Sequence, residues 1–177
     1  MKIARLIITL CCPRSCVYCV NKNSRILLMA HPMEDLFRLT DYDIILITGG
    51  EPTVIPEKTL SLILEIRRAI GDVKSLYLYT ALFSKNWTHK LIDATDGITY
   101  TLHDDCSDAE VDNFIQFQEM IGGVRVKSHR LNLGPNIAKA IPIRPSVWKR
   151  IKVKNWFSPE EQHIPENETL FMLNPLK

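Results

Sequence analysis

Residues 2–19 read KIARLIITLCCPRSCVYC, and the organisation of the whole chain starts from this stretch. The run from Lys2 to Leu10 is nearly all aliphatic, as is typical of a strand buried on both faces of a parallel sheet. Three cysteines follow at the spacing C-x3-C-x2-C, namely Cys12, Cys16 and Cys19. We therefore predict that they lie on the loop that leaves the carboxyl end of a buried strand.

These cysteines fall within eight residues, so their thiolates can reach three corners of one metal cluster. A four-iron cube takes four ligands, usually thiolates, and this loop leaves one iron open. An open metal position is typical of catalytic rather than structural sites. Cys11 could replace Cys12, at the spacing C-x4-C-x2-C. If the strand extends that far, Cys11 points away from Cys12, and we expect it to be a small buried hydrophobic residue.

A second motif, Thr48-Gly49-Gly50-Glu51-Pro52, follows an apolar run from Asp43 to Ile47. That run predicts another strand, so this motif also lies at a strand end. The two glycines permit a positive φ angle and close approach of a ligand to the backbone. The Glu51 carboxylate and a strand-end carbonyl can receive the ammonium group of an amino acid. The alternative is an ordinary glycine turn closed by Pro52.

Helices and strands alternate along the rest of the chain. Pro56 opens the clearest helix, whose apolar residues recur at helical spacing up to the C-terminal cap Gly71, and another helix begins with a capping box at Ser107. Residues 20–30 are expected to be irregular, and a short helix is expected over His31 to Leu39. The remaining predicted elements are strands over Lys74 to Thr80, Gly97 to Leu102 and Val124 to Asn132, and a helix from Ser84 to Ala94.

This alternation indicates an α/β fold with a mainly parallel sheet. A full (β/α)₈ barrel usually takes about 250 residues. Because this chain has 177, we expect a single domain built as an open partial (β/α) barrel with about five or six strands. Residues 133–177 are expected to form an irregular C-terminal extension that packs on the partial barrel. Sites in such folds gather at the carboxyl ends of the strands, where both motifs lie.

Both motifs resemble those of the radical S-adenosylmethionine (SAM) superfamily. The resemblance favours Cys12 over Cys11 and implies that Cys12, Cys16 and Cys19 bind a [4Fe–4S] cluster. It also implies a set of SAM contacts: Tyr18 at the adenine, Gly49, Gly50 and Glu51 at the amino group, and Thr80, His103 and Asn132 at the carboxylate and ribose. The last three are assigned by position only, because they close the predicted third, fourth and fifth strands.

The resemblance implies an enzyme that takes one electron from an external donor and cleaves SAM to methionine and a 5′-deoxyadenosyl radical. The radical abstracts hydrogen from a small-molecule or protein substrate that no motif identifies, and no motif marks catalytic residues. Two groups of short relatives compete: activases that install a glycyl radical on a partner protein, and 7-carboxy-7-deazaguanine synthase-like enzymes. Both usually carry a glycine-containing segment before the cluster strand, whereas the sequence here starts at that strand.

Composition limits the partners and the compartment. The net charge of +2 predicts no general affinity for nucleic acid or for membranes. No uncharged apolar stretch is long enough to span a bilayer, and no signal-peptide cleavage site precedes the first predicted strand. Four of the five cysteines crowd into nine residues, which suits metal binding and a reducing compartment better than disulfides. We therefore expect a cytoplasmic protein.

The stretch from Arg144 to Lys154 carries five basic residues and no acidic one. Strand alternation places Ile151 and Val153 on one face. It places a basic and aromatic set on the other face, namely Trp148, Arg150, Lys152, Lys154 and Trp156. We expect this strand to lie along the lateral opening of the barrel with its two aliphatic residues inward. Its basic face either meets an anionic substrate or partner, or guards an edge strand against pairing.

A zinc-stabilised binding module is the alternative from a different class of function. Cys16 and Cys19 supply half of a structural zinc site, and His103 with Cys106 are scattered candidates for the other half. The basic strand then recruits an anionic partner. Colour separates the two hypotheses, because an iron–sulfur protein purified without oxygen is brown and a zinc protein is colourless.

Overall fold

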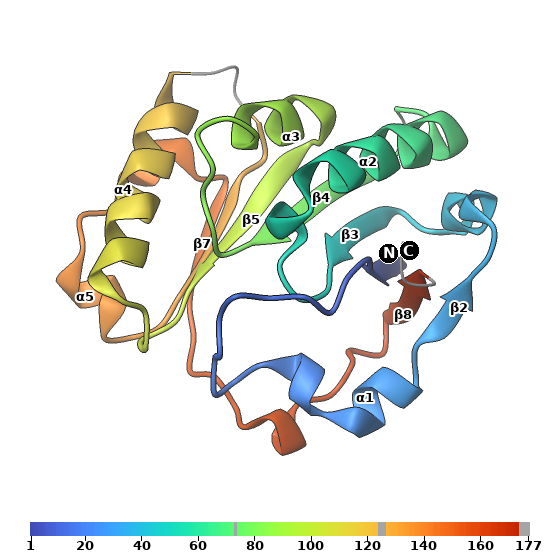
Figure 1. Ribbon diagram of the computed structural model, residues 1–177, viewed down its shortest axis with the longest axis horizontal. Coiled ribbons are helices and arrows are strands. Elements are labelled where there is room, and N and C mark those ends of the chain that lie inside the picture. Colours follow the sequence, from blue (N-terminus) through green and yellow to red (C-terminus); the bar gives the residue numbers. More distant parts are fainter. Residues whose placement is uncertain (73, 124–126, 174–177) are drawn as a thin grey trace.

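The computed structural model describes residues 1–72, 74–123 and 127–173. They form one sheet of eight strands in the order β2-β8-β1-β3-β4-β5-β6-β7 (Figure 1), and every neighbouring pair is parallel. Across these residues the end strands β2 and β7 do not pair, so the α/β fold with an open, parallel sheet is confirmed. The strands are β1 (Ile3–Ile7), β2 (His31–Met33), β3 (Ile44–Thr48), β4 (Ser75–Thr80), β5 (Gly97–Leu102), β6 (Arg130–Leu133), β7 (Arg150–Val153) and β8 (Glu168–Leu173).

The three longest helices pack along one face of this sheet (Figure 1). They are α2 (Pro56–Ile70), α3 (Thr88–Ala94) and α4 (Asp108–Gly122), and the hydrophobic core lies between them and the strands. Gly71 ends α2 with a φ of 67°, and the Ser107 capping box begins α4, both as predicted. None of the helices in the described ranges has the length and apolar character needed to cross a bilayer.

The number of strands is a correction, because five or six were predicted and eight are found. β2 occupies residues predicted to be helical, and β8 lies in the extension predicted to be irregular. β2 has only three residues, and β8 is held between β2 and β1, so both strands depend on pairing with distant parts of the chain. Eight strands fit in this chain because short turns replace long helices beside β2, β7 and β8.

Two smaller points concern residues 20–30 and the predicted segments that lie partly outside the described residues. Residues 20–30 are not irregular throughout, because they contain η1 (Val20–Lys22) and α1 (Ser24–Leu28), which Asn23 caps through its side chain. Part of the strand predicted from Val124, residues 124–126, lies outside the described residues, as do residues 174–177 of the predicted extension.

The basic strand is the edge strand β7, but its predicted faces are only partly right. Trp148 is buried, with its ring 6.0 Å from that of Phe114, instead of sharing the basic face. Val153 is 55% exposed instead of packing inward. The 3₁₀ turn η4 (Pro145–Val147) places Trp148 before the strand begins, so strand alternation does not apply to it.

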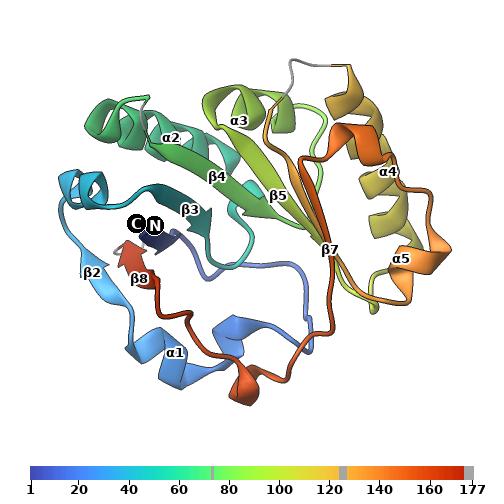
Figure 2. The same ribbon diagram turned by 180° about the vertical axis from the view of Figure 1, so that it is seen from behind.

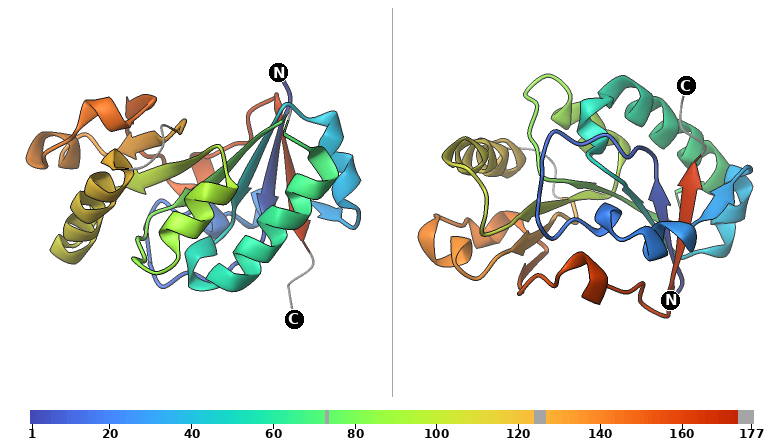
Figure 3. Two further views of the ribbon diagram at one scale, coloured as in Figure 1. Left: turned by 90° about the horizontal axis from the view of Figure 1, so that it is seen from above. Right: turned by 60° about the horizontal axis from the view of Figure 1, so that its bottom comes forward.

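The segment between β7 and β8, residues 154–167, crosses the open side of the sheet beside the chain that follows the cysteine loop (Figures 2 and 3). Its turn η5 (Pro159–Glu161) contacts η1. The Asn23 side-chain amide donates a hydrogen bond of 2.6 Å to the carbonyl of Pro159. This segment of the C-terminal extension therefore packs across the open side of the sheet.

Candidate functional site

A cavity of about 390 Å³ opens at the carboxyl ends of the strands. Strand residues such as Arg5, Tyr79 and Asn132 line it, and they alternate with core residues that face the helices. Every residue predicted to bind a cluster or SAM is in the lining, which brings together Cys12, Cys16, Tyr18, Cys19, Gly49, Gly50, Glu51, Thr80, His103 and Asn132. Segments from the ends of five different strands therefore meet at one place.

The glycine motif packs directly against the start of the cysteine loop. Gly49 has a φ of 133°, and Gly50 N–H donates a hydrogen bond of 2.6 Å to the Thr9 carbonyl. A Cβ on Gly50 would overlap the carbonyl of Cys11. The predicted reason for these glycines was close approach of a ligand, whereas here the space beside them is filled by the backbone of residues 9–11.

Glu51 is 2% exposed, and its carboxylate joins the ends of β3 and β4. Oε1 accepts hydrogen bonds from the backbone N–H of Thr53 at 3.1 Å and from its hydroxyl at 2.7 Å. Oε1 also accepts from the Thr80 hydroxyl at 2.7 Å, and Oε2 accepts from Ala81 N–H at 2.9 Å. Oε1 thus accepts three hydrogen bonds, whereas Oε2 accepts one from the described residues and can accept a further donor.

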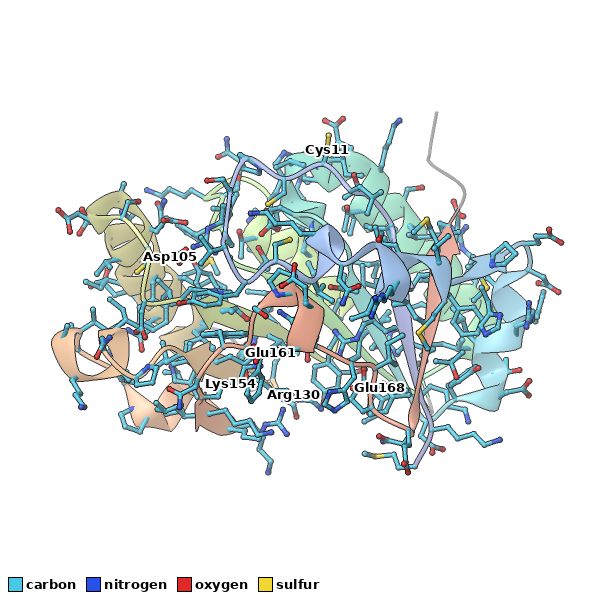
Figure 4. The ribbon with its side chains drawn as sticks, turned by 90° about the horizontal axis from the view of Figure 1, so that it is seen from below. Cys11, Asp105, Arg130, Lys154, Glu161 and Glu168 are labelled. Atoms are coloured by element: carbon cyan, nitrogen blue, oxygen red, sulfur yellow. The ribbon has the colours of Figure 1, made fainter. Side chains whose placement is uncertain are left out.

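The three predicted ligands lie on one loop that faces the cavity. Partial burial raises the pKa of the Cys12 and Cys16 thiols, and the nearby Cys19 acts on both in the same direction. Cys11 is exposed, is not in the lining, and lies at the rim of the molecule in Figure 4. The expectation of a buried Cys11 is therefore wrong, because β1 ends at Ile7 and its alternation does not reach the cysteines.

The fit of this loop to a metal depends on the kind of site. Within the described ranges, no group of three or more His, Cys, Asp or Glu side chains converges tightly enough to hold one metal ion. A tetrahedral zinc ion takes four donors at one point, whereas a cluster of four irons takes each thiolate on a different iron. Three thiolates on one loop are a donor set that such a cluster accepts.

Arg14 anchors the cysteine loop to α4. Its guanidinium forms an ion pair with Glu110, and the two side chains are 11% and 18% exposed. Burial works to raise the pKa of Glu110, but hydrogen bonds from Ser107 and the charge of Arg14 outweigh it and lower that pKa. Since Ser107 and Glu110 form the capping box of α4, the same carboxylate caps the helix and holds the loop.

An aromatic stack forms one wall of the cavity. The rings of Tyr18 and His103 are 5.9 Å apart, and those of His103 and Trp156 are 4.1 Å apart and nearly parallel. The Lys154 ammonium lies 3.9 Å from the centre of the Trp156 ring. Burial and the charge of Arg14 lower the pKa of His103 to about 4, so its imidazole is neutral at neutral pH.

Several lining residues were not predicted as site residues. Arg5 binds Glu168 through two nitrogens, at 2.7 and 2.8 Å, and its guanidinium lies 5.2 Å from the Tyr79 ring. Residues 154–165 add Trp156 and Gln162, which no motif marks. The only signal for this segment was the alternating basic stretch that ends at Lys154 and Trp156. These residues reach the site through tertiary contacts alone.

Comparison of the chain with protein-family models gave no match, and comparison with curated proteins gave none either.

Proposed function

We propose that this chain is a radical SAM enzyme with a [4Fe–4S] cluster on Cys12, Cys16 and Cys19. The observation that supports the proposal is the meeting of two separate motifs, and of three residues assigned only by strand position, in the lining of one cavity. When bound, the cluster supplies the electron that cleaves SAM to methionine and a 5′-deoxyadenosyl radical. An external one-electron donor and a substrate with an abstractable hydrogen complete the reaction.

In this proposal the protein binds and orients SAM at the strand ends. The SAM ammonium is held by the free acceptor position of Glu51 Oε2 and by strand-end carbonyls. The polar side chains of Thr80 and Asn132 lie beside the site for the carboxylate and ribose. The neutral imidazole of His103 avoids repulsion of the SAM sulfonium and stacks with Tyr18 beside the adenine. The segment over residues 154–167 limits the access of water to the radical.

Iron loading tests the metal assignment. Anaerobic reconstitution should load about four irons and four sulfides per chain. Substitution of Cys12, Cys16 or Cys19 by Ala should each abolish loading, because each removes one ligand. Cys11→Ala and Cys106→Ala are matched controls and should load fully. Stoichiometric zinc with no iron uptake would instead support the zinc-stabilised binding module.

Cleavage of SAM tests the reaction. With dithionite as the electron donor, the loaded protein should form 5′-deoxyadenosine slowly even without its substrate. Cys16→Ala should form none, whereas Cys106→Ala should form it at the rate of the unmodified protein. A loaded cluster with no 5′-deoxyadenosine would overturn the enzyme proposal while leaving the metal assignment intact.

A further inference from the structure

The ion pairs around the cavity involve two of its three lining cations. Its lining contains three Lys and Arg side chains among the described residues. Arg5 is paired with Glu168, and Arg14 is paired with Glu110. Lys154 has no carboxylate partner among the ion pairs that the structure describes, and its ammonium contacts the Trp156 ring. Lys154 is therefore the lining cation that no described ion pair neutralises, while the Glu51 carboxylate of the same lining is bound by neutral donors of Thr53, Thr80 and Ala81.

The position of Lys154 is set by the fold. Its backbone N–H donates a hydrogen bond of 3.0 Å to the Leu133 carbonyl, which extends the pairing of β7 with β6 by one residue. The Trp156 ring lies between the ammonium on one side and the His103 ring on the other. Figure 4 shows Lys154 on the same side of the molecule as Arg130 and Glu168. The side chain is therefore directed by sheet pairing and by a stacked ring.

The surroundings of Lys154 favour an anion. Partial burial lowers the pKa of its ammonium to about 8, and the positive charges of Lys152, Arg5 and Arg150 act in the same direction. The residue itself keeps solvent access, so a ligand can reach it. A bound carboxylate or phosphate would replace repulsion among these cations by charge-assisted hydrogen bonds.

The two other basic residues of the strand differ from Lys154. All three basic residues are exposed, but Arg150 and Lys152 are not part of the cavity lining, whereas Lys154 is. Their sheet partners are Arg130 and Asn132, so they stand nearer the amino end of the strands than Lys154 does. Of the three charges that the sequence places on one face, a single one enters the site.

We propose that Lys154 binds an anionic group, a carboxylate or a phosphate, of the substrate at the open side of the sheet. This inference rests on the proposed radical SAM function, because it assigns the substrate class of the same cavity. Arg150 and Lys152 guard the exposed edge and add to the local positive potential.

Anion binding tests the inference without depending on iron loading. The probes are inorganic phosphate and acetate, and the readout is the ¹⁹F NMR signal of Trp156 in protein labelled with 5-fluorotryptophan, assigned with Trp156→Phe. One anion should shift this signal saturably, and the anion that binds more tightly identifies the substrate group. Lys154→Met, which keeps the aliphatic stem, should weaken binding about tenfold or more. Lys154→Arg should retain it, and Lys152→Met is the matched control.

Two results would overturn the inference. The first is a Trp156 signal that does not shift, or that shifts equally in the Lys154→Met and Lys152→Met proteins. The second is a rise of about tenfold in the SAM concentration needed for 5′-deoxyadenosine formation in Lys154→Met, which would mean that Lys154 binds the SAM carboxylate. Absence of iron loading or of 5′-deoxyadenosine, with anion binding intact, would count against the proposed function alone.

Discussion

The side-chain amide of Gln162 donates a hydrogen bond of 2.8 Å to the backbone carbonyl of Tyr18. The two residues are 144 positions apart in the sequence. Tyr18 lies between Cys16 and Cys19 on the cysteine loop, and Gln162 lies on the segment that crosses the open side of the sheet. This bond therefore ties the predicted cluster site to the C-terminal part of the chain.

Removing this hydrogen bond should loosen the cluster site. Gln162→Ala also removes the hydrogen bond of 3.1 Å from the same amide to the Phe157 carbonyl, so it is expected to lower the free energy of unfolding by about 1–2 kcal/mol. It should also speed the loss of iron from the reconstituted protein to a chelator, because the loop opens more often. Iron release is followed by the colour of the chelator complex. Gln116→Ala, at an exposed position of α4, is the control and should release iron at the original rate. Equal rates in both variants would argue against the coupling.

The glycine motif should tolerate no side chain at Gly50. In Gly50→Ala the new Cβ overlaps the Cys11 carbonyl, so the start of the cysteine loop must move. We expect a loss of about 1–3 kcal/mol in stability, as in other overpacked positions, and reduced iron loading after reconstitution. Gly123→Ala is the matched control, since the nearest atom to its Cβ is 3.7 Å away. Full iron loading in Gly50→Ala would show that the loop does not depend on this contact.

Glu51 should contribute to stability as well as to the proposed SAM site. Glu51→Ala leaves the Ala81 N–H without its acceptor, and it leaves the Thr80 hydroxyl with only the Leu82 carbonyl, at 3.0 Å, as an acceptor. We expect a loss of about 2–4 kcal/mol in the free energy of unfolding, measured in urea. Glu119→Ala, at an exposed position of α4, should change it by no more than about 0.5 kcal/mol. A loss in Glu51→Ala as small as in this control would mean that the four hydrogen bonds are not maintained in solution.

Stability should fall with acid through His129. This residue is 2% exposed, and its Nδ1 accepts a hydrogen bond of 3.2 Å from Ile98 N–H. Burial and then the charge of Lys127 lower the pKa of His129 to about 4. Between about pH 6.5 and that value the unfolded chain binds a proton that the folded chain does not, so the folded state loses stability as the pH falls.

We expect this single imidazole to account for a loss of about 2 kcal/mol between pH 7.5 and pH 5. Urea unfolding at the two pH values measures it. His129→Gln keeps an oxygen acceptor for Ile98 N–H and should show a smaller loss over the same interval. If the loss is the same in the variant, His129 does not remain neutral in the folded protein.

Local sequence patterns were sufficient for the central part of the fold. β1, β3, β4 and β5 are each rich in aliphatic, aromatic or β-branched residues, and α2 carries a periodic apolar face, so each was predicted from its own residues. Parallel strands place their carboxyl ends at one edge, and residues that follow them must therefore lie close together. For that reason the two motifs were expected to lie together, and the resemblance added Tyr18 and the strand-end residues Thr80, His103 and Asn132. All of them line the cavity.

Only the tertiary structure decided which segment crosses the open side of the sheet. β8 pairs with β1 and β2 and turns a stretch without a clear pattern into part of the sheet. Gln162, Trp156 and Lys154 reach the cavity because the segment before β8 crosses it. Hydrogen bonds such as that between Gln162 and Tyr18 form only after distant strands have paired. Sequence periodicity reflects the local conformation of a segment. The contacts that bring Gln162, Trp156 and Lys154 to the cavity join segments far apart in the sequence, so periodicity does not predict them.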